Sequence, residues 1–134
     1  MSALIIKKIN SYEYSLEEDI EVSSLGLTIK VKKGFVFDGA SIPKIFWGIV
    51  GSPFTGNYTL SALVHDALYV TESLERKAAD EIFLDLMKQG NVSYLKRHTM
   101  YWAVRTGGYF VWKKHTEESI ERNKKYIEIR EVKR

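Results

Sequence analysis

The spacing of apolar residues changes once along the chain, and this change constrains the fold more than any other feature. Up to residue 37 apolar side chains tend to recur at every second position, as Leu27, Ile29 and Val31 do, which is typical of a strand with one wet face. From residue 59 onward they recur at helical spacing. This order predicts an α+β domain: a small N-terminal antiparallel β-sheet, a long apolar loop, then a helix hairpin plus a third helix. We expect the strands around residues 5–9, 12–22 and 27–37, with a turn at residues 23–26.

Capping residues divide the helical half into three helices. The candidates for their first positions are Thr59 or Ser61, Thr71 or Ser73, and Ser93. Gly90 is expected to end the second helix, and the third is expected to run as far as Gly107 and Gly108. Because only about three residues separate the first two helices, these helices must run antiparallel as a hairpin.

The loop between the two halves, residues 38–57, contains two prolines and four glycines. Loops of this length inside a compact domain are usually functional or disordered. This loop is too apolar for disorder, since it carries Ile42, Ile45, Phe46, Trp47, Ile49 and Phe54. We therefore expect it to pack down as a cover over a site.

Length and charge favour one domain. The 134 residues have a net charge of +3, and the excess of basic residues lies in residues 113–134. Residues 1–112 are expected to form the domain, with 113–134 as a charged extension packed on it or trailing it. Acidic and basic residues are interleaved in this extension, which favours a solvated helical face and argues against a nucleic-acid partner.

The chain has no cysteine, which excludes disulfides and thiolate metal sites. The first ten residues contain only a short apolar run before two lysines, so neither a signal peptide nor a transmembrane segment is expected. The predicted location is the host cytoplasm or, for a phage protein, the virion.

The residues that point to chemistry are His65 and Asp66 in the first helix and Asp80 in the second. Tyr69 follows His65 by one helical turn and lies on the same face. Across the hairpin, Asp80 can hold one imidazole nitrogen of His65 and leave the other free as a general base. Asp66 points elsewhere and can hold a hard cation such as calcium, with Asp38 and loop carbonyls.

Each of these residues also has a structural interpretation. His65 can be a core histidine with satisfied hydrogen bonds, Arg76 can pair with Asp80 at i, i+4, and Asp66 can brace the loop. Asp38 can anchor the turn that follows it by accepting the N–H of Ala40 or Ser41. We expect His98 and His115 at the surface and the three tryptophans, Trp47, Trp102 and Trp112, in the core.

Several motifs follow one another along the chain: GFVFDGASIP at residues 34–43, Phe46-Trp47, His65-Asp66 with Leu68-Tyr69, Arg76 with Ala79-Asp80 and Phe83, and Tyr101 to Arg105 leading to Gly108 and Trp112. In this order they make the chain resemble a phage-associated family, domain of unknown function 1353. Phe37 departs from the threonine expected there. The resemblance implies a setting in phages or prophages rather than a mechanism.

The helix around His65 is also similar to that of secreted phospholipase A2, which reads H-D-x-C-Y. This similarity implies that His65 activates water, Asp66 binds calcium and Asp80 orients His65. The chain lacks the paired cysteines and the glycine pattern of the calcium loop, which puts the metal in doubt.

Two functions remain open on the sequence. One is a hydrolase of esters, lipids included, with His65, Asp80 and Tyr69 in the catalytic site and calcium as a candidate cofactor. The other is a non-catalytic tail, virion or assembly component, or a binder of a host factor, in which the same residues brace the loop. Convergent exposed carboxylates would favour the enzyme, and a fully buried His65 with both nitrogens bonded would favour the structural role.

Overall fold

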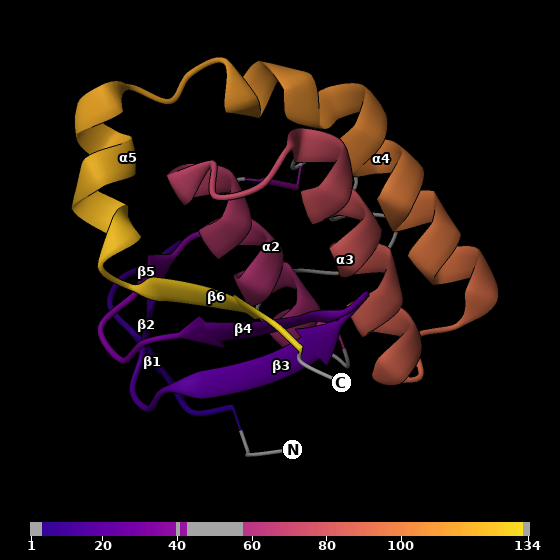
Figure 1. The fold of residues 1–134 in the computed structure, drawn as a ribbon, viewed down its shortest axis with the longest axis horizontal. Helices are drawn as coiled ribbons and strands as arrows, with labels where there is room; N and C mark the ends of the chain where they lie inside the picture. Colours follow the sequence, from indigo (N-terminus) through magenta and orange to yellow (C-terminus); the bar gives the residue numbers. More distant parts are fainter. Residues whose placement is uncertain (1–3, 40, 43–57, 133–134) are drawn as a thin grey trace.

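A computed structural model describes residues 4–39, 41–42 and 58–132 (Figure 1). Within these residues, helices pack beside two small antiparallel sheets, which confirms the α+β prediction. The strands are β1 (Ile6–Lys8), β2 (Tyr14–Leu16), β3 (Ile20–Ser24), β4 (Leu27–Val31), β5 (Val36–Phe37) and β6 (Ile127–Glu131). The helices are α2 (Thr59–Thr71), α3 (Arg76–Gln89), α4 (Tyr94–Trp112) and α5 (Glu117–Lys124). None of the described helices is long and apolar enough to span a membrane.

The N-terminal strands form two sheets, where one was expected. The first has the order β1-β2-β5, and the second has the order β3-β4-β6. The strand predicted over residues 12–22 is therefore divided between the two sheets. In the second sheet β3 and β4 are joined by Leu25 and Gly26, whose φ angles of 48° and 82° suit a two-residue hairpin turn.

The C-terminal segment is part of the fold. Its second half is β6, which pairs antiparallel with β4 so that Ile129 lies opposite Ile29 (Figure 1). The expectation of a charged helical face holds only for α5, which has no buried residue. The alternation of Ile127 and Ile129 with charged neighbours was the available signal for a strand.

The helix hairpin is present, with different caps. Tyr58 and Glu75 occupy the N-cap positions of α2 and α3, and neither side chain makes a capping hydrogen bond. Ser93 caps α4 as predicted, by accepting the N–H of Lys96. Helix α4 continues through Gly108 to Trp112, beyond the end that the glycine pair predicted.

Helix α2 lies at the centre of the core, because both its neighbouring helices and the sheets pack around it (Figure 1). All its residues except Leu60 and Val70 are buried. Burial of a large apolar side chain stabilises a fold by about 1.5–3 kcal/mol, so this helix contributes a large share of the core. The tryptophan prediction was wrong for Trp102, which is 62% exposed on α4. Trp112 is half-buried, and Trp47 lies outside the described residues.

Candidate active site

The site is built on the buried helix α2, which carries His65, Asp66 and Tyr69. His65 and Tyr69 are one turn apart, and their rings lie 4.3 Å apart between centroids. The ring of Phe83 on α3 lies 4.6 Å from His65, so the imidazole is held between aromatic side chains. His65 is fully buried, and its packing against the rings of Tyr69 and Phe83 fixes the direction in which its two nitrogens point.

The predicted contact across the hairpin is present. His65 Nε2 lies 2.7 Å from Asp80 Oδ1, and both residues are fully buried. The short link between α2 and α3 brings the two helices into register at this level, as the spacing required. Tyr69 joins the same carboxylate by donating its hydroxyl to Asp80 Oδ1 at 2.7 Å.

The second oxygen of Asp80 faces two arginines. Arg105 on α4 donates to Oδ2 at 2.9 Å, and the predicted i, i+4 partner Arg76 lies at 3.5 Å. Burial alone would raise the pKa of Asp80, but the hydrogen bonds from His65, Tyr69 and Arg105 outweigh it and hold this pKa below its usual value. Asp80 is therefore ionised, and Arg105 is a site residue that the local sequence pattern could not identify.

The other imidazole nitrogen is not free, contrary to expectation. His65 Nδ1 lies 2.9 Å from the hydroxyl oxygen of Ser41, which follows the end of β5 by four residues. Gly39, with a φ of 71°, makes the turn that brings the chain from β5 onto α2. Ser41, His65 and Asp80 thus form a continuous hydrogen-bonded series of the hydroxyl–imidazole–carboxylate type. Sequence reasoning missed the Ser41 hydroxyl, because it expected only the Ser41 N–H to act, as a partner of Asp38.

Asp66 braces the segment after β5, as one interpretation predicted. Its Oδ2 accepts the N–H of Gly39 at 3.0 Å, and its Oδ1 accepts the N–H of Ser41 at 3.1 Å. The Ser41 hydroxyl also makes a short hydrogen bond to Oδ1. The Ser41 N–H expected at Asp38 therefore goes to Asp66, and Ala40 lies outside the described residues. Burial and the nearby charge of Asp38 raise the pKa of Asp66 to about 7.

Counting protons shows which way this series runs. Since Asp80 is ionised and accepts hydrogen bonds, His65 Nε2 carries a proton. Burial lowers the pKa of His65 despite Asp80, so the ring is neutral and Nδ1 is an acceptor. The single Ser41 hydroxyl proton then has two acceptors, Asp66 Oδ1 and His65 Nδ1, and protonation of Asp66 leaves it to His65. An ionised Asp66 would compete with His65 for that hydroxyl proton.

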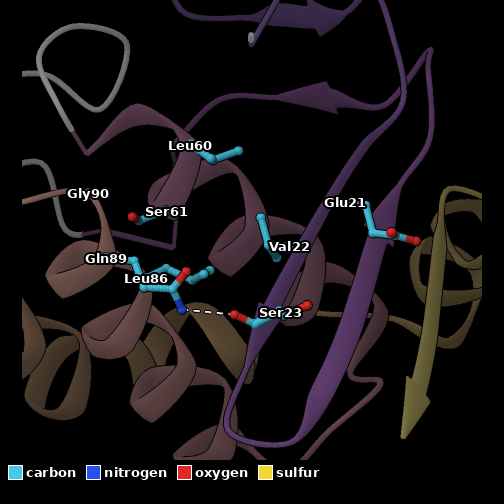
Figure 2. Close-up of a pocket in the computed structure, with 8 residues that line it drawn as sticks. All are labelled: Glu21, Val22, Ser23, Leu60, Ser61, Leu86, Gln89 and Gly90. Carbon is cyan, nitrogen blue, oxygen red and sulfur yellow. Dashed lines mark hydrogen bonds between the residues drawn. The ribbon is translucent and has the colours of Figure 1, made fainter. Parts of the chain in front are cut away.

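A cavity of about 290 Å³ reaches this series. It is lined by Asp38, Ser41, Asp66, Tyr69, Val70, Val111, Lys114 and His115. A second cavity, of about 470 Å³, lies between β3 and the helices α2 and α3 (Figure 2). Its lining has no histidine, and the Gln89 side chain is already bonded to Ser23 O at 2.8 Å. The smaller cavity is therefore the candidate site.

The remaining candidate residues divide between surface and cavity. His98 on α4 is half-buried with its ring 4.2 Å from that of Tyr94. His115, also expected at the surface, has a side chain only 10% exposed and lines the candidate cavity.

Among the described residues no three histidine or acidic side chains come together as metal ligands. Asp38 and Asp66 share the cavity, but Asp66 faces N–H groups, which repel a cation, so the described donors do not fit calcium.

Comparison with known proteins assigns the chain to a family. Residues 14–104, more than half of it, match the model of a family described as protein of unknown function, DUF1353. The chain belongs to this family. The DUF1353 match contains Ser41, His65 and Asp80 and ends one residue before Arg105.

The chain is also similar to an uncharacterized protein, y4jT, of Sinorhizobium fredii (strain NBRC 101917 / NGR234). The two are 40% identical over 83 residues, which are 62% of this chain and 25% of that relative. The chain thus spans about a quarter of the length of the relative it matches. No solved structure matches the chain.

Proposed function

We propose that this DUF1353 protein is a hydrolase of carboxylic esters in which Ser41 is the nucleophile, His65 the base and Asp80 the group that orients the base. One observation carries the proposal: the Ser41 hydroxyl oxygen lies 2.9 Å from His65 Nδ1, and His65 Nε2 lies 2.7 Å from Asp80. A nucleophile bonded to a base that a third group orients is the arrangement that activates a serine.

The reaction follows from these contacts. Ser41 Oγ attacks the ester carbonyl carbon while its proton passes to His65 Nδ1, and Asp80 stabilises the imidazolium that forms. The alcohol leaves with a proton, and water then hydrolyses the acyl group on Ser41. Tyr69, Arg76 and Arg105 act as positioning residues, because they hold the Asp80 carboxylate in place and do not contact His65 Nδ1.

The cavity limits the substrate. Ser41 is only 2% exposed, so an ester reaches it by way of the adjoining cavity. The side chains of Val70, Val111 and Tyr69 give this cavity an apolar wall that accepts an acyl chain. Lipid esters are therefore one substrate class within the proposal. The proposal also places the protein in a phage or prophage setting, in the host cytoplasm or the virion.

A second candidate is a non-catalytic role, and a specific observation favours it. His65 is fully buried and both its nitrogens are bonded to protein, as in a histidine that braces a core. In that case the same residues fasten the segment after β5 to α2, and the protein serves as a phage tail, virion or assembly component, or as a binder of a host factor.

Hydrolysis of p-nitrophenyl butyrate separates the two candidates. The enzyme proposal expects turnover that Ser41→Ala lowers by at least about 10³-fold, since the nucleophile is lost. Ser61→Ala is the matched control, because Ser61 is also buried but lines the cavity of Figure 2 instead. Equal rates for wild type and Ser41→Ala would leave the non-catalytic role.

A further inference from the structure

A second histidine faces the same cavity as Ser41. His115 follows α4, and its Nδ1 lies 3.0 Å from Glu72 Oε2. The side chains are 10% and 29% exposed, so this pair is sheltered without being sealed. The Trp112 ring packs nearby, tilted by 55° to the imidazole, with its centroid 5.9 Å from that of His115. The imidazole is thus held by a carboxylate on one side and an aromatic ring on another.

The other nitrogen of His115 is accessible. Its Nε2 has no hydrogen-bond partner among the described residues. No buried side-chain nitrogen or oxygen of these residues lacks a partner, so an unpartnered Nε2 on this half-buried residue must reach solvent. His65 differs in this respect, because its two nitrogens are both occupied and the ring is fully buried.

The position of Glu72 is costly for α2 alone. Glu72 is the C-cap of this helix in the left-handed conformation, with a φ of 46°, which is unfavourable for a residue with a side chain. A carboxylate at this end of a helix is also opposed by the helix dipole. The stability of α2 therefore does not explain Glu72, whereas its bond to His115 does.

The charges around the cavity fit proton transfer at this point. Lys114 lies beside His115, while Asp38 and Asp66 line the cavity with Ser41. No described acidic group forms an ion pair with the Lys114 ammonium. The cavity volume of about 290 Å³ holds one small ligand, so an ester bound at Ser41 also meets the residues that line the cavity around it.

We propose that His115, oriented by Glu72, is the acid–base group on the solvent side of the site, with His65 serving only Ser41. This inference rests on the proposed ester hydrolase. Glu72 accepts the hydrogen bond from His115 Nδ1–H, which leaves Nε2 to exchange protons with the ester or water in the cavity. Glu72 is a positioning residue, because it acts through His115.

The proton balance closes over one turnover. In acylation the Ser41 proton moves to His65 Nδ1, the bond from the carbonyl carbon to the alcohol oxygen breaks, and His115 Nε2 gives its proton to that oxygen. In deacylation neutral His115 takes a proton from the attacking water. The bond from the carbonyl carbon to Ser41 Oγ then breaks, and His65 returns its proton to Ser41. Both histidines end in their starting states.

The dependence of the hydrolysis rate on the leaving group tests the acid–base role of His115, because a loss of stability would affect all esters alike. p-Nitrophenolate leaves without a proton, whereas ethanol needs one, so His115→Asn should lower turnover of ethyl butyrate by roughly 10²-fold or more. The burst of p-nitrophenol from p-nitrophenyl butyrate should change less than about 5-fold, and mass spectrometry should find the Ser41 acyl-enzyme accumulated, because deacylation lacks its base. His98→Asn is the control, since His98 lies on α4 away from this cavity.

Three outcomes count against the inference. If His115→Asn lowers the p-nitrophenol burst by the same factor as the turnover of ethyl butyrate, and no acyl-enzyme accumulates, His115 has only a structural role in an active enzyme. If neither substrate is affected, His115 takes no part in the reaction. If wild type shows no Ser41-dependent turnover of either ester, the proposed hydrolase fails, and this inference fails with it.

Discussion

His65 has two different sides, and each ends in a buried carboxylate. On the side of α3 and α4, Asp80 receives hydrogen bonds from Tyr69 and Arg105 and has its pKa held below the usual value. On the side of the segment after β5, no arginine among the described residues pairs with Asp66, and burial with Asp38 nearby raises the pKa of Asp66 to about 7. Both carboxylates are 2% exposed or less, so their neighbours and not their depth separate them.

The difference between the pKa values of Asp80 and Asp66 shows which carboxyl group of the site is charged and which one takes up a proton. Two carboxylates whose surroundings push their pKa values apart mark the fixed anion and the proton-bearing group of a site. Asp80 is the fixed anion that supports His65, whereas Asp66 takes up a proton near pH 7, which frees the Ser41 hydroxyl for His65. The predictions below remove one side at a time.

The largest effect is expected from Asp80→Asn. The variant leaves Arg105 and Arg76 without their buried counter-charge and removes the support of His65. Loss of one partner of a buried ion pair costs about 3–5 kcal/mol, which urea unfolding would measure as a lower free energy of unfolding. Glu121→Gln is the control, because its pair with Lys124 is exposed and should cost less than about 1 kcal/mol. Equal costs for the two variants would contradict the special role of Asp80.

A smaller loss is expected from Gly108→Ala. A Cβ at residue 108 would lie 2.5 Å from the Tyr69 hydroxyl and 3.1 Å from the Arg76 Nη1 atom. Tyr69 must then move away from Asp80, at a cost of about 1–3 kcal/mol for overpacking. Thr106→Ala on the exposed face of α4 should change the free energy of unfolding by less than about 0.5 kcal/mol. A neutral Gly108→Ala would mean that α4 does not fix the Tyr69 contact.

The two carboxylates should respond to pH in opposite directions. Since the folded pKa of Asp66 is raised, its contribution is fully present below pH 3.8 and is lost as the pH rises toward about 7. The contribution of Asp80, whose folded pKa is lowered, is present above pH 3.8 and is lost in stronger acid.

Asp66→Asn should therefore remove a downward slope of stability between pH 4 and 7. One proton per molecule limits that slope to about 1.4 kcal/mol per pH unit. The measurement is the free energy of unfolding at several pH values for wild type and variant. Identical slopes would show that Asp66 does not hold a proton in the folded protein.

The smallest effect is expected from calcium. Because Asp66 already accepts the N–H groups of Gly39 and Ser41, millimolar calcium should leave the melting temperature of the wild type unchanged within error of a chelator control. A rise of several degrees that Asp66→Asn abolishes would place calcium at Asp66 and require these N–H groups to turn away. A rise that survives Asp66→Asn would place the ion elsewhere.

The sequence predicted the parts of this molecule that depend on neighbouring residues. Helical spacing and the short link after α2 were enough to place His65 opposite Asp80, because both lie a fixed number of turns from one link. The pairing of β6 with β4 and the approach of Ser41 and Arg105 to His65 and Asp80 join residues far apart in sequence. No local spacing carries that information. Trp102 is exposed because α4 packs through its other face, which includes Gly108, and a count of aromatic residues could not reveal this.

The central claim is that His65 activates Ser41, and labelling with a fluorophosphonate tests it most directly. This reagent forms a covalent adduct with a serine hydroxyl that a base has activated, and peptide mass spectrometry locates the adduct. We expect one adduct per wild-type molecule, on Ser41, and none on Ser41 in folded His65→Gln. Adducts on other serines, or an unmodified Ser41 in folded wild type, would contradict the account.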